Sequence, residues 1–143
     1  MNKSKETLAV VCSGTGFTSL AIRFIEEKNN LEEKDYDLLA IPGSIHSLAI
    51  ASRRFRLHRK VLEEQISFLV EKHGLKRVFV LEHENCAWFK ELSESDKAFF
   101  EKSQDDVFKE ALQLIQSLLP RNTLVEAWQA REKEGKVEFE KLN

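Results

Sequence analysis

Residues 68–86 read FLVEKHGLKRVFVLEHENC, and this stretch decides the predicted fold. Apolar residues at helical spacing end at Gly74, a residue type that commonly follows the last turn of a helix. The apolar run at 76–83 then predicts a buried strand. His83 and Cys86 lie three residues apart in the loop that follows. This one stretch therefore predicts a helix, a strand and a loop that carries a histidine and a cysteine, two residue types that can bind a metal ion.

The segments on either side extend the same pattern. Runs at 7–12 and 36–41 predict two further strands, each followed by a turn that contains glycine. The spacing of apolar residues predicts helices over 17–27, 58–74 and 96–119, the last one capped by Ser93 or Ser95. Residues 122–131 and 135–142 alternate between apolar and polar side chains, which predicts a C-terminal β-hairpin.

This order of elements predicts one α/β domain over residues 1–143. Alternation of strands and helices favours three layers, with a central, mostly parallel sheet between helices. The hairpin is expected to form an antiparallel edge. The first three strands are expected to be buried on both faces, because their apolar runs are short and continuous.

The composition is that of an ordinary globular domain. The formal net charge of −2 gives no electrostatic case for nucleic acid or an anionic membrane as a partner. No apolar run approaches the roughly 20 residues that span a bilayer, and the first residues lack the cleavage pattern of a secretory leader. Two cysteines without a leader favour reduced thiols and a cytoplasmic location, although a disulfide between Cys12 and Cys86 stays open.

The candidate ligating residues all follow predicted strands. Cys12 ends the first strand, His46 follows the second, and His83 and Cys86 follow the third. Ligands of open α/β sheets bind at the carboxyl ends of the strands, so these residues meet if the first and third strands are neighbours. Two thiolates and an imidazole suit zinc and leave a fourth position open, as in catalytic sites. The alternative is that each cysteine is a small buried hydrophobe.

Taken together, these stretches resemble the β-class carbonic anhydrases. The family's C-x-D-x-R loop corresponds to CSGTG (12–16), and its glycine loop corresponds to IPGSIH (41–46). Its H-x-x-C loop corresponds to HENC (83–86), and its closing hairpin corresponds to LVEAWQAREKEGKVEFEKL (124–142). The resemblance implies a β-carbonic anhydrase-like fold with Zn²⁺ on Cys12, His83 and Cys86. It also implies reversible hydration of CO2 to bicarbonate by a zinc-bound hydroxide, and a homo-oligomer, by analogy a dimer.

The first metal loop departs from the family pattern. The family's aspartate falls on Gly14 and its arginine on Gly16, and Ala87 replaces the usual glycine after the second cysteine. In the family, that aspartate accepts a hydrogen bond from the zinc-bound water. An alternative function is therefore a non-catalytic zinc- or anion-binding homologue that serves as a sensor or interaction module. The backbone N–H groups of Gly14 and Gly16, near a helix N-terminus, suit an anion such as bicarbonate.

Candidates for the missing catalytic group are His46, Glu84 and Ser13. His46 is a candidate fourth ligand or proton carrier, with a surface or helix-capping residue as the alternative. Glu82 and Glu84 are candidates for ligating zinc or holding its water, but carboxylates at a strand end are more often solvated. Ser13 and Thr15 are candidates for bonding a hydroxide or anion, although such turn residues usually bond their own backbone.

Two further features have ordinary explanations. The basic segment 52–60 is expected to be a solvated helix face. Trp88, Phe89, Phe99 and Phe100 are expected to form an aromatic cluster in the core. A thiol enzyme built on Cys86 and the preceding histidine is disfavoured, since no third group is seen to orient the pair.

Overall fold

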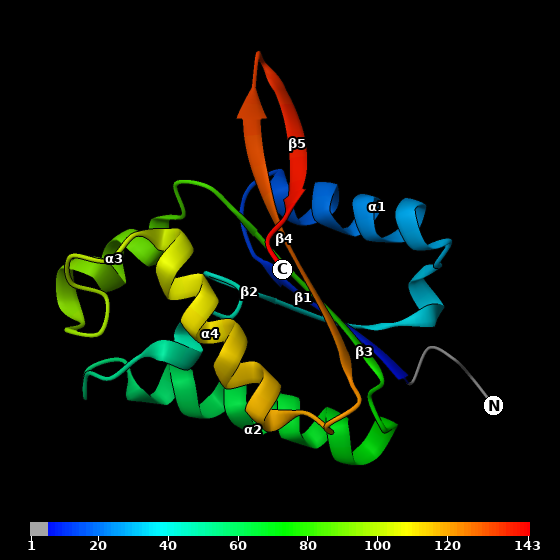
Figure 1. The fold of residues 1–143 in the computed structure, drawn as a ribbon, viewed down its shortest axis with the longest axis horizontal. Helices are drawn as coiled ribbons and strands as arrows, with labels where there is room; N and C mark the ends of the chain where they lie inside the picture. The colour runs from blue at the N-terminus through cyan, green and yellow to red at the C-terminus, as the bar shows by residue number, and fades with distance from the viewer. Residues whose placement is uncertain (1–5) are drawn as a thin grey trace.

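The computed structural model describes residues 6–143, so the first five residues, on which the expectation about a leader partly rests, lie outside it. The described residues form a five-stranded sheet in the order β2-β1-β3-β4-β5 (Figure 1). The strands are β1 (Thr7–Cys12), β2 (Asp37–Ile41), β3 (Arg77–His83), β4 (Leu124–Lys133) and β5 (Lys136–Lys141). All pairings are parallel except that of β5 with β4. The predicted α/β fold is confirmed.

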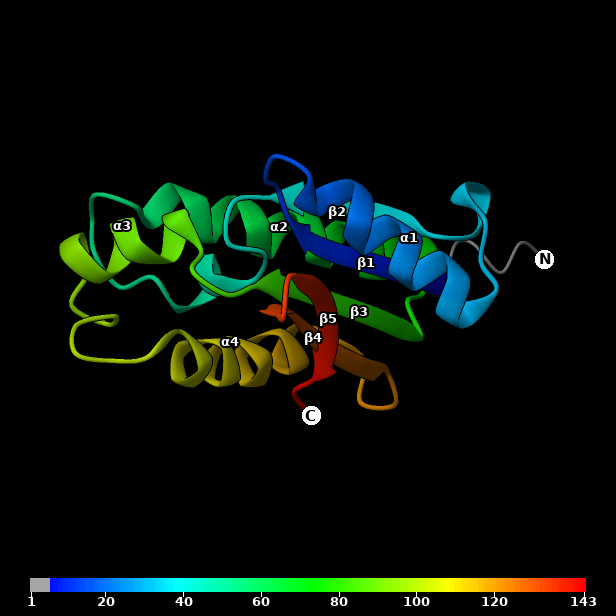
Figure 2. The same ribbon diagram turned by 90° about the horizontal axis from the view of Figure 1, so that it is seen from above.

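Helices cover both faces of this sheet (Figures 1 and 2). They are α1 (Phe17–Asn29), α2 (Arg56–His73), α3 (Ala87–Ser95) and α4 (Gln104–Leu118), with short 3₁₀ turns at Glu33–Asp35 and His46–Ala49. Successive strand residues point to opposite faces. Thus Ala9 and Val11 of β1 pack toward α1, whereas Leu8 and Val10 pack toward α2 and α4. Within residues 6–143, every helix is too short or too polar to cross a membrane.

The predicted helix over 96–119 is wrong in its first part. Residues 96–103 form turns, and α4 begins only at Gln104. Its N-cap is Ser103, whose Oγ accepts the N–H of Asp106 at 3.1 Å, and neither Ser93 nor Ser95 plays that part. Helix α3, over 87–95, was not predicted.

Two burial predictions also need correction. Strand β2 is not buried on both faces, because it is the edge strand of the sheet and Leu38 is 40% exposed. The aromatic cluster is incomplete as well. Phe99 is fully buried and packs against Phe89, with ring centroids 5.9 Å apart, whereas Phe100 is 48% exposed.

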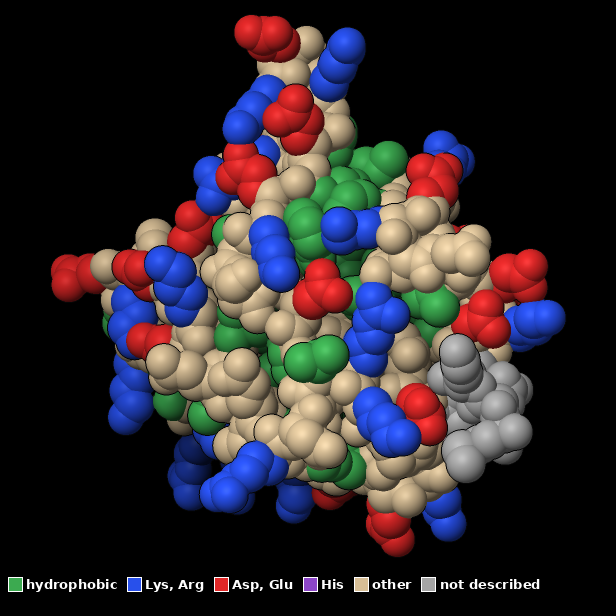
Figure 3. Space-filling model, turned by 45° about the vertical axis from the view of Figure 1, so that its right-hand side comes forward, with side chains coloured by type: hydrophobic (Ala, Val, Ile, Leu, Met, Phe, Trp, Pro, Cys, Tyr) green, Lys and Arg blue, Asp and Glu red, His purple; other side chains and the backbone are tan. Residues whose placement is uncertain are grey.

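The hairpin of β4 and β5 projects beyond the rest of the sheet (Figure 1). Acidic and basic side chains alternate along it, and hydrophobic side chains gather at its base (Figure 3). Lys133 pairs with Glu138 and Glu140. At the base, Phe139 stacks on Phe24 of α1 with ring centroids 4.1 Å apart, which fixes the hairpin against that helix.

The strand order brings three loops to one edge of the sheet. Strand β1 lies between β2 and β3 and is parallel to both, with Cys12 opposite Ile41 and Val11 opposite Leu81. The loops after β1, β2 and β3 therefore leave the sheet side by side. This arrangement confirms the neighbour relationship on which the predicted site depends.

Candidate metal centre

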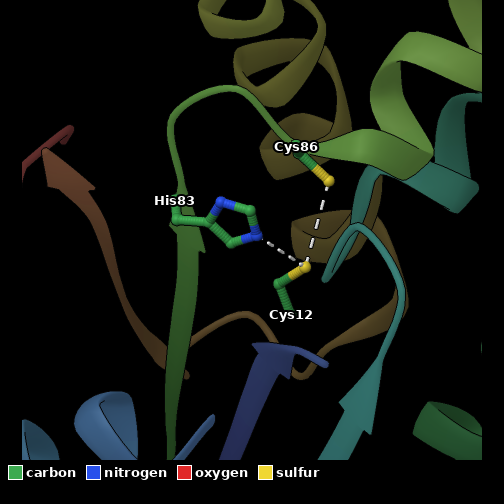
Figure 4. A group of neighbouring side chains, drawn as sticks. All are labelled: Cys12, His83 and Cys86. Atoms are coloured by element: carbon green, nitrogen blue, oxygen red, sulfur yellow. Dashed lines mark hydrogen bonds between the residues drawn. The ribbon is translucent and has the colours of Figure 1, made fainter. Parts of the chain in front are cut away.

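Cys12, His83 and Cys86 point toward one another at the carboxyl edge of the sheet (Figure 4). The Sγ atom of Cys12 lies 3.4 Å from Nε2 of His83 and 3.9 Å from Sγ of Cys86. The three candidate ligand atoms all lie within 4.8 Å of one another. Both cysteines are buried free thiols, so they form no disulfide in this structure. The fold thus assembles the residues singled out from sequence.

The orientation of His83 suits a metal ligand. Its Nδ1 lies 2.9 Å from the carbonyl oxygen of Glu84, which can only accept a hydrogen bond. Nδ1 therefore carries the proton, and Nε2, which faces the two sulfur atoms, keeps its lone pair free. The ring of Phe17 packs on the imidazole, with centroids 4.9 Å apart, and helps to hold it.

The two thiols differ in their hydrogen bonds. A hydrogen bond with Cys12 lowers the pKa of Cys86 against the effect of burial, and His46 and the N–H of Phe89 lower it further. That bond and burial raise the pKa of Cys12, although Gly43 N–H donates to its Sγ at 3.2 Å. These opposite directions follow from one hydrogen bond between the two sulfur atoms, in which either can be the donor. A soft cation that bound both sulfur atoms would displace their protons.

His46 lies fully buried beside this group and is not one of the three converging side chains. Its Nε2 is 2.9 Å from Oε2 of Glu82, although neither ring nitrogen has a partner in hydrogen-bond geometry. Burial alone would lower the pKa of His46, but Cys86 and Glu82 outweigh it and raise the pKa to about 9. The interpretation of His46 as a surface or capping residue is therefore wrong.

The two glutamates that flank His83 lie in different environments. Glu82 is fully buried, which contradicts the expectation that it is solvated. Its carboxylate accepts hydrogen bonds from Nε2 of Gln129 at 2.7 Å and from Nε2 of Gln104 at 3.0 Å. Glu84 is partly exposed, and its Oε1 accepts the N–H of Glu132 at 2.8 Å. The buried carboxylate of Glu82 thus joins β3 to α4 and β4, and the carboxylate of Glu84 bonds the backbone of β4.

The sequence of this chain matches one family model over nearly its whole length. The model of a family described as "Putative carbonic anhydrase" matches residues 1–139. The chain belongs to this carbonic anhydrase family. Among curated relatives it is similar to an uncharacterized protein of Rickettsia bellii, 24% identical over 102 residues. That match covers 68% of this chain and 61% of the relative. A second relative, an uncharacterized protein of Rickettsia conorii, is 31% identical over 73 residues. That match covers 48% of this chain and 38% of the relative.

Solved carbonic anhydrases share the fold of this family member. The β-carbonic anhydrase of Trichomonas vaginalis superposes with a TM-score of 0.61 at 15% identity, covering 95% of this chain and 82% of that one. The carbonic anhydrase of Glaciozyma antarctica superposes with a TM-score of 0.60 at 16% identity, and the match covers 100% of this chain and 85% of that one. The carbonic anhydrase of Streptococcus mutans superposes with a TM-score of 0.58 at 14% identity, and the match covers 99% of this chain and 82% of that one.

Beside the candidate metal centre of this carbonic anhydrase family member lies a cavity of about 440 Å³. Its lining includes Gly14, Thr15, Gly16, Phe17, His83 and Arg131. A Cβ atom at Gly14 would lie 3.8 Å from Nε2 of His83, so this position faces the ligand atom without a side chain. The N–H of Gly14 donates to Oγ1 of Thr18 at 3.3 Å. Ser13 is exposed, and its N–H donates to the carbonyl of Ile41.

Sequence reasoning missed Gln104 and Gln129, which bind the buried carboxylate of Glu82. One signal was present for Gln104. It precedes Val107 and Phe108 by three and four positions, so a polar residue extends the apolar stripe of α4. Gln129 interrupts the apolar face of β4 in the same way and is 1% exposed. A polar residue on a buried face needs a hydrogen-bond partner. Here the partner is Glu82, which is adjacent in sequence to the candidate ligand His83.

Proposed function

We propose that this protein binds zinc through Cys12, His83 and Cys86 and interconverts CO2 and bicarbonate. The observation that supports this most is the convergence of two sulfur atoms and one imidazole nitrogen within 4.8 Å, beside a cavity. This donor set is one that zinc prefers, and three protein ligands leave a fourth position open. A zinc ion held there would supply Lewis acidity, which can lower the pKa of water to about 7.

The protein's own groups would prepare this chemistry. The Nδ1–H of His83, held by the Glu84 carbonyl, keeps Nε2 as the ligating atom. The N–H of Gly43 draws charge from the Cys12 sulfur, which counters the electron donation of two thiolates. Bicarbonate would lie in the cavity near the N-terminal end of α1, where the helix dipole favours an anion.

A non-catalytic zinc- or anion-binding role is the second candidate. Gly14 favours it, because this position faces Nε2 of His83 yet supplies no carboxylate to hold a water molecule. In that case the centre would bind metal or an anion without turnover. Reduced, buried thiols are compatible with a cytoplasmic location for either function, and we include this location in the proposal.

Stopped-flow measurement of CO2 hydration distinguishes the two functions. The zinc-loaded wild type is compared with Cys86→Ser, which keeps the loop but removes one soft ligand. We expect a rate above the uncatalysed one in the wild type and its loss in the variant. A zinc-loaded wild type that hydrates CO2 no faster than Cys86→Ser would reject the carbonic anhydrase activity and leave the binding role.

The proposal includes a homodimer. Helix α2 exposes Leu57, Val61 and Phe68, with side chains 73%, 49% and 55% accessible. These residues recur on one side of the helix, and Val61 and Phe68 line one hollow with Leu39 of the adjacent edge strand. Contiguous exposed apolar side chains mark an interaction surface more often than isolated ones do.

The partner expected by analogy with the β-class carbonic anhydrases is a second copy of this chain, with its α2 packed on this surface. We expect Phe68→Glu to dissociate the dimer in sedimentation experiments, whereas Leu124→Glu, at an exposed leucine elsewhere, should not. A wild type that is monomeric at all concentrations would reject this part of the proposal.

A further inference from the structure

Gln104, the first residue of α4, spans the loop that carries two of the three candidate ligands. Its Oε1 accepts the backbone N–H of Cys86 at 3.2 Å. Its Nε2 donates to the carbonyl oxygen of His83 at 2.7 Å. One amide therefore contacts the backbone of both ligands and fixes the separation between the end of β3 and the start of α3.

The loop needs such a contact because the sheet stops supporting it. The pairing of β3 with β4 ends at His83 and Ala130, and the N–H of Glu84 makes one further bond to Ala130. Asn85 then adopts the left-handed conformation, with φ of 58°, and the chain turns toward α3. Cys86 thus lies beyond the sheet, and Gln104 gives its N–H a partner.

The side chain of Gln104 is itself held in one orientation. Its Nε2 also donates to Oε2 of Glu82 at 3.0 Å, and the carbonyl oxygen of His83, which the same Nε2 contacts, can only accept a hydrogen bond. The other carboxylate oxygen accepts from Gln129, which in turn donates to Asp105 at 2.9 Å. The amide nitrogen of Gln104 must therefore face the carbonyl of His83, so its oxygen must face the N–H of Cys86.

We propose that Gln104 is a positioning residue for the metal centre, setting the geometry of His83 and Cys86 through their backbone. This inference rests on the proposed zinc site but adds a residue outside it. Two substitutions distinguish the hydrogen bond that Gln104 accepts from the two that it donates. Gln104→Glu keeps an acceptor for Cys86 N–H, loses both donors and adds a charge beside Glu82. Gln104→Met keeps the length of the side chain and loses all three hydrogen bonds.

The test is zinc affinity, measured by competition with a chromophoric chelator. Loss of a group that orients a ligand typically costs about 10- to 100-fold in metal affinity. We expect the zinc Kd to rise by about that factor in Gln104→Glu and in Gln104→Met. Gln113→Glu is the matched control, since Gln113 is an exposed glutamine on the same helix, and its Kd should not change. The Co²⁺-loaded variants should also show altered thiolate-to-metal charge-transfer bands, which a mere loss of stability would not produce.

A readout without metal distinguishes failure of this inference from failure of the proposed function. In the metal-free protein, the amide hydrogen of Cys86 should exchange at least tenfold faster in Gln104→Met than in Gln104→Glu, which keeps the acceptor. Equal exchange rates, or a zinc Kd in both Gln104 variants within about twofold of the wild type, would overturn the inference. A wild type without zinc affinity would overturn the proposed function, and the exchange rates would still decide the role of Gln104.

Discussion

The sulfur of Cys12 lies 3.4 Å from Nε2 of His83, although 71 positions separate them in the chain. The contact follows from the strand order, because β1 and β3 are parallel neighbours and both residues end their strands. Cys86 joins them from the loop after β3. The candidate ligand set is therefore assembled by sheet topology, and only its H-x-x-C half is local in sequence.

Gly14→Asp should increase CO2 hydration. A Cβ at this position would lie 3.8 Å from Nε2 of His83 and 3.8 Å from Cβ of Phe17, which are ordinary contacts. The new carboxylate would lie beside the proposed metal and accept a hydrogen bond there, which we expect to raise the rate by tenfold or more. Stopped-flow rates check this.

Gly14→Ala is the control for that experiment, since it adds the Cβ alone. Equal rates in the two variants would show that position 14 does not limit the reaction. A matching Gly16→Arg substitution is less informative, because Gly16 has φ of 81°, which an arginine adopts only with strain.

Gly43→Ala should destabilise the fold more than Gly74→Ala. Both glycines have positive φ, so each alanine costs about 1 kcal/mol in backbone strain. Only at Gly43 would the Cβ also meet a neighbour, lying 2.5 Å from Cδ1 of Trp88. Overpacking of this kind typically adds about 1–3 kcal/mol. Urea unfolding of the two variants measures the difference, and equal losses would contradict the close packing of Trp88 on this loop.

Asp96→Ala should lower the free energy of unfolding by about 2–4 kcal/mol, because it strips three N–H groups of a charged partner. The carboxylate of Asp96 is buried and accepts the N–H groups of Ala51, Ser52 and Ala98 at 2.7–3.2 Å. It joins the segment before α2 to the turns between α3 and α4. Glu94→Ala, at an exposed neighbour, is the control and should cost little.

The contribution of Asp96 should depend on pH. Burial alone would raise the pKa of Asp96, but the N–H groups of Ser52, Ala98 and Ala51 hold the pKa below its ordinary value. The unfolded state therefore binds this proton more readily, so the stabilisation is complete above about pH 4 and is lost as pH falls through the folded pKa. The difference in unfolding free energy between wild type and Asp96→Asn should shrink on acidification. A difference that is constant down to pH 2 would contradict this.

Much of the fold could be predicted because the signals are local. Strand β1 has the predicted bounds, and Gly74 ends α2 in the left-handed conformation, with its N–H bonded to Val70. The start of α4 could not be predicted, since the carboxylate of Asp96 that organises the preceding turns has partners more than 40 positions away. Nor does an apolar run show which strand forms the edge, as the exposure of Leu38 demonstrates.

The convergence of Cys12, His83 and Cys86 could be predicted from sequence, whereas the residues around them could not. The three candidate ligands follow from strand ends and from the family resemblance. The burial of Glu82 does not follow, because its two glutamine partners come from α4 and β4. His46 is buried for a similar reason, with Phe89 and Phe108 packed around its ring. Such partners are set by tertiary packing, which no local pattern encodes.

The most direct test of the account is the zinc content per chain of protein purified without added metal or chelator. The wild type is compared with the double variant Cys12→Ser/Cys86→Ser. The account predicts about one zinc per wild-type chain and none in the double variant. A wild type that carries no zinc and takes up none when it is offered, with both thiols free, would contradict it and leave only the shared fold.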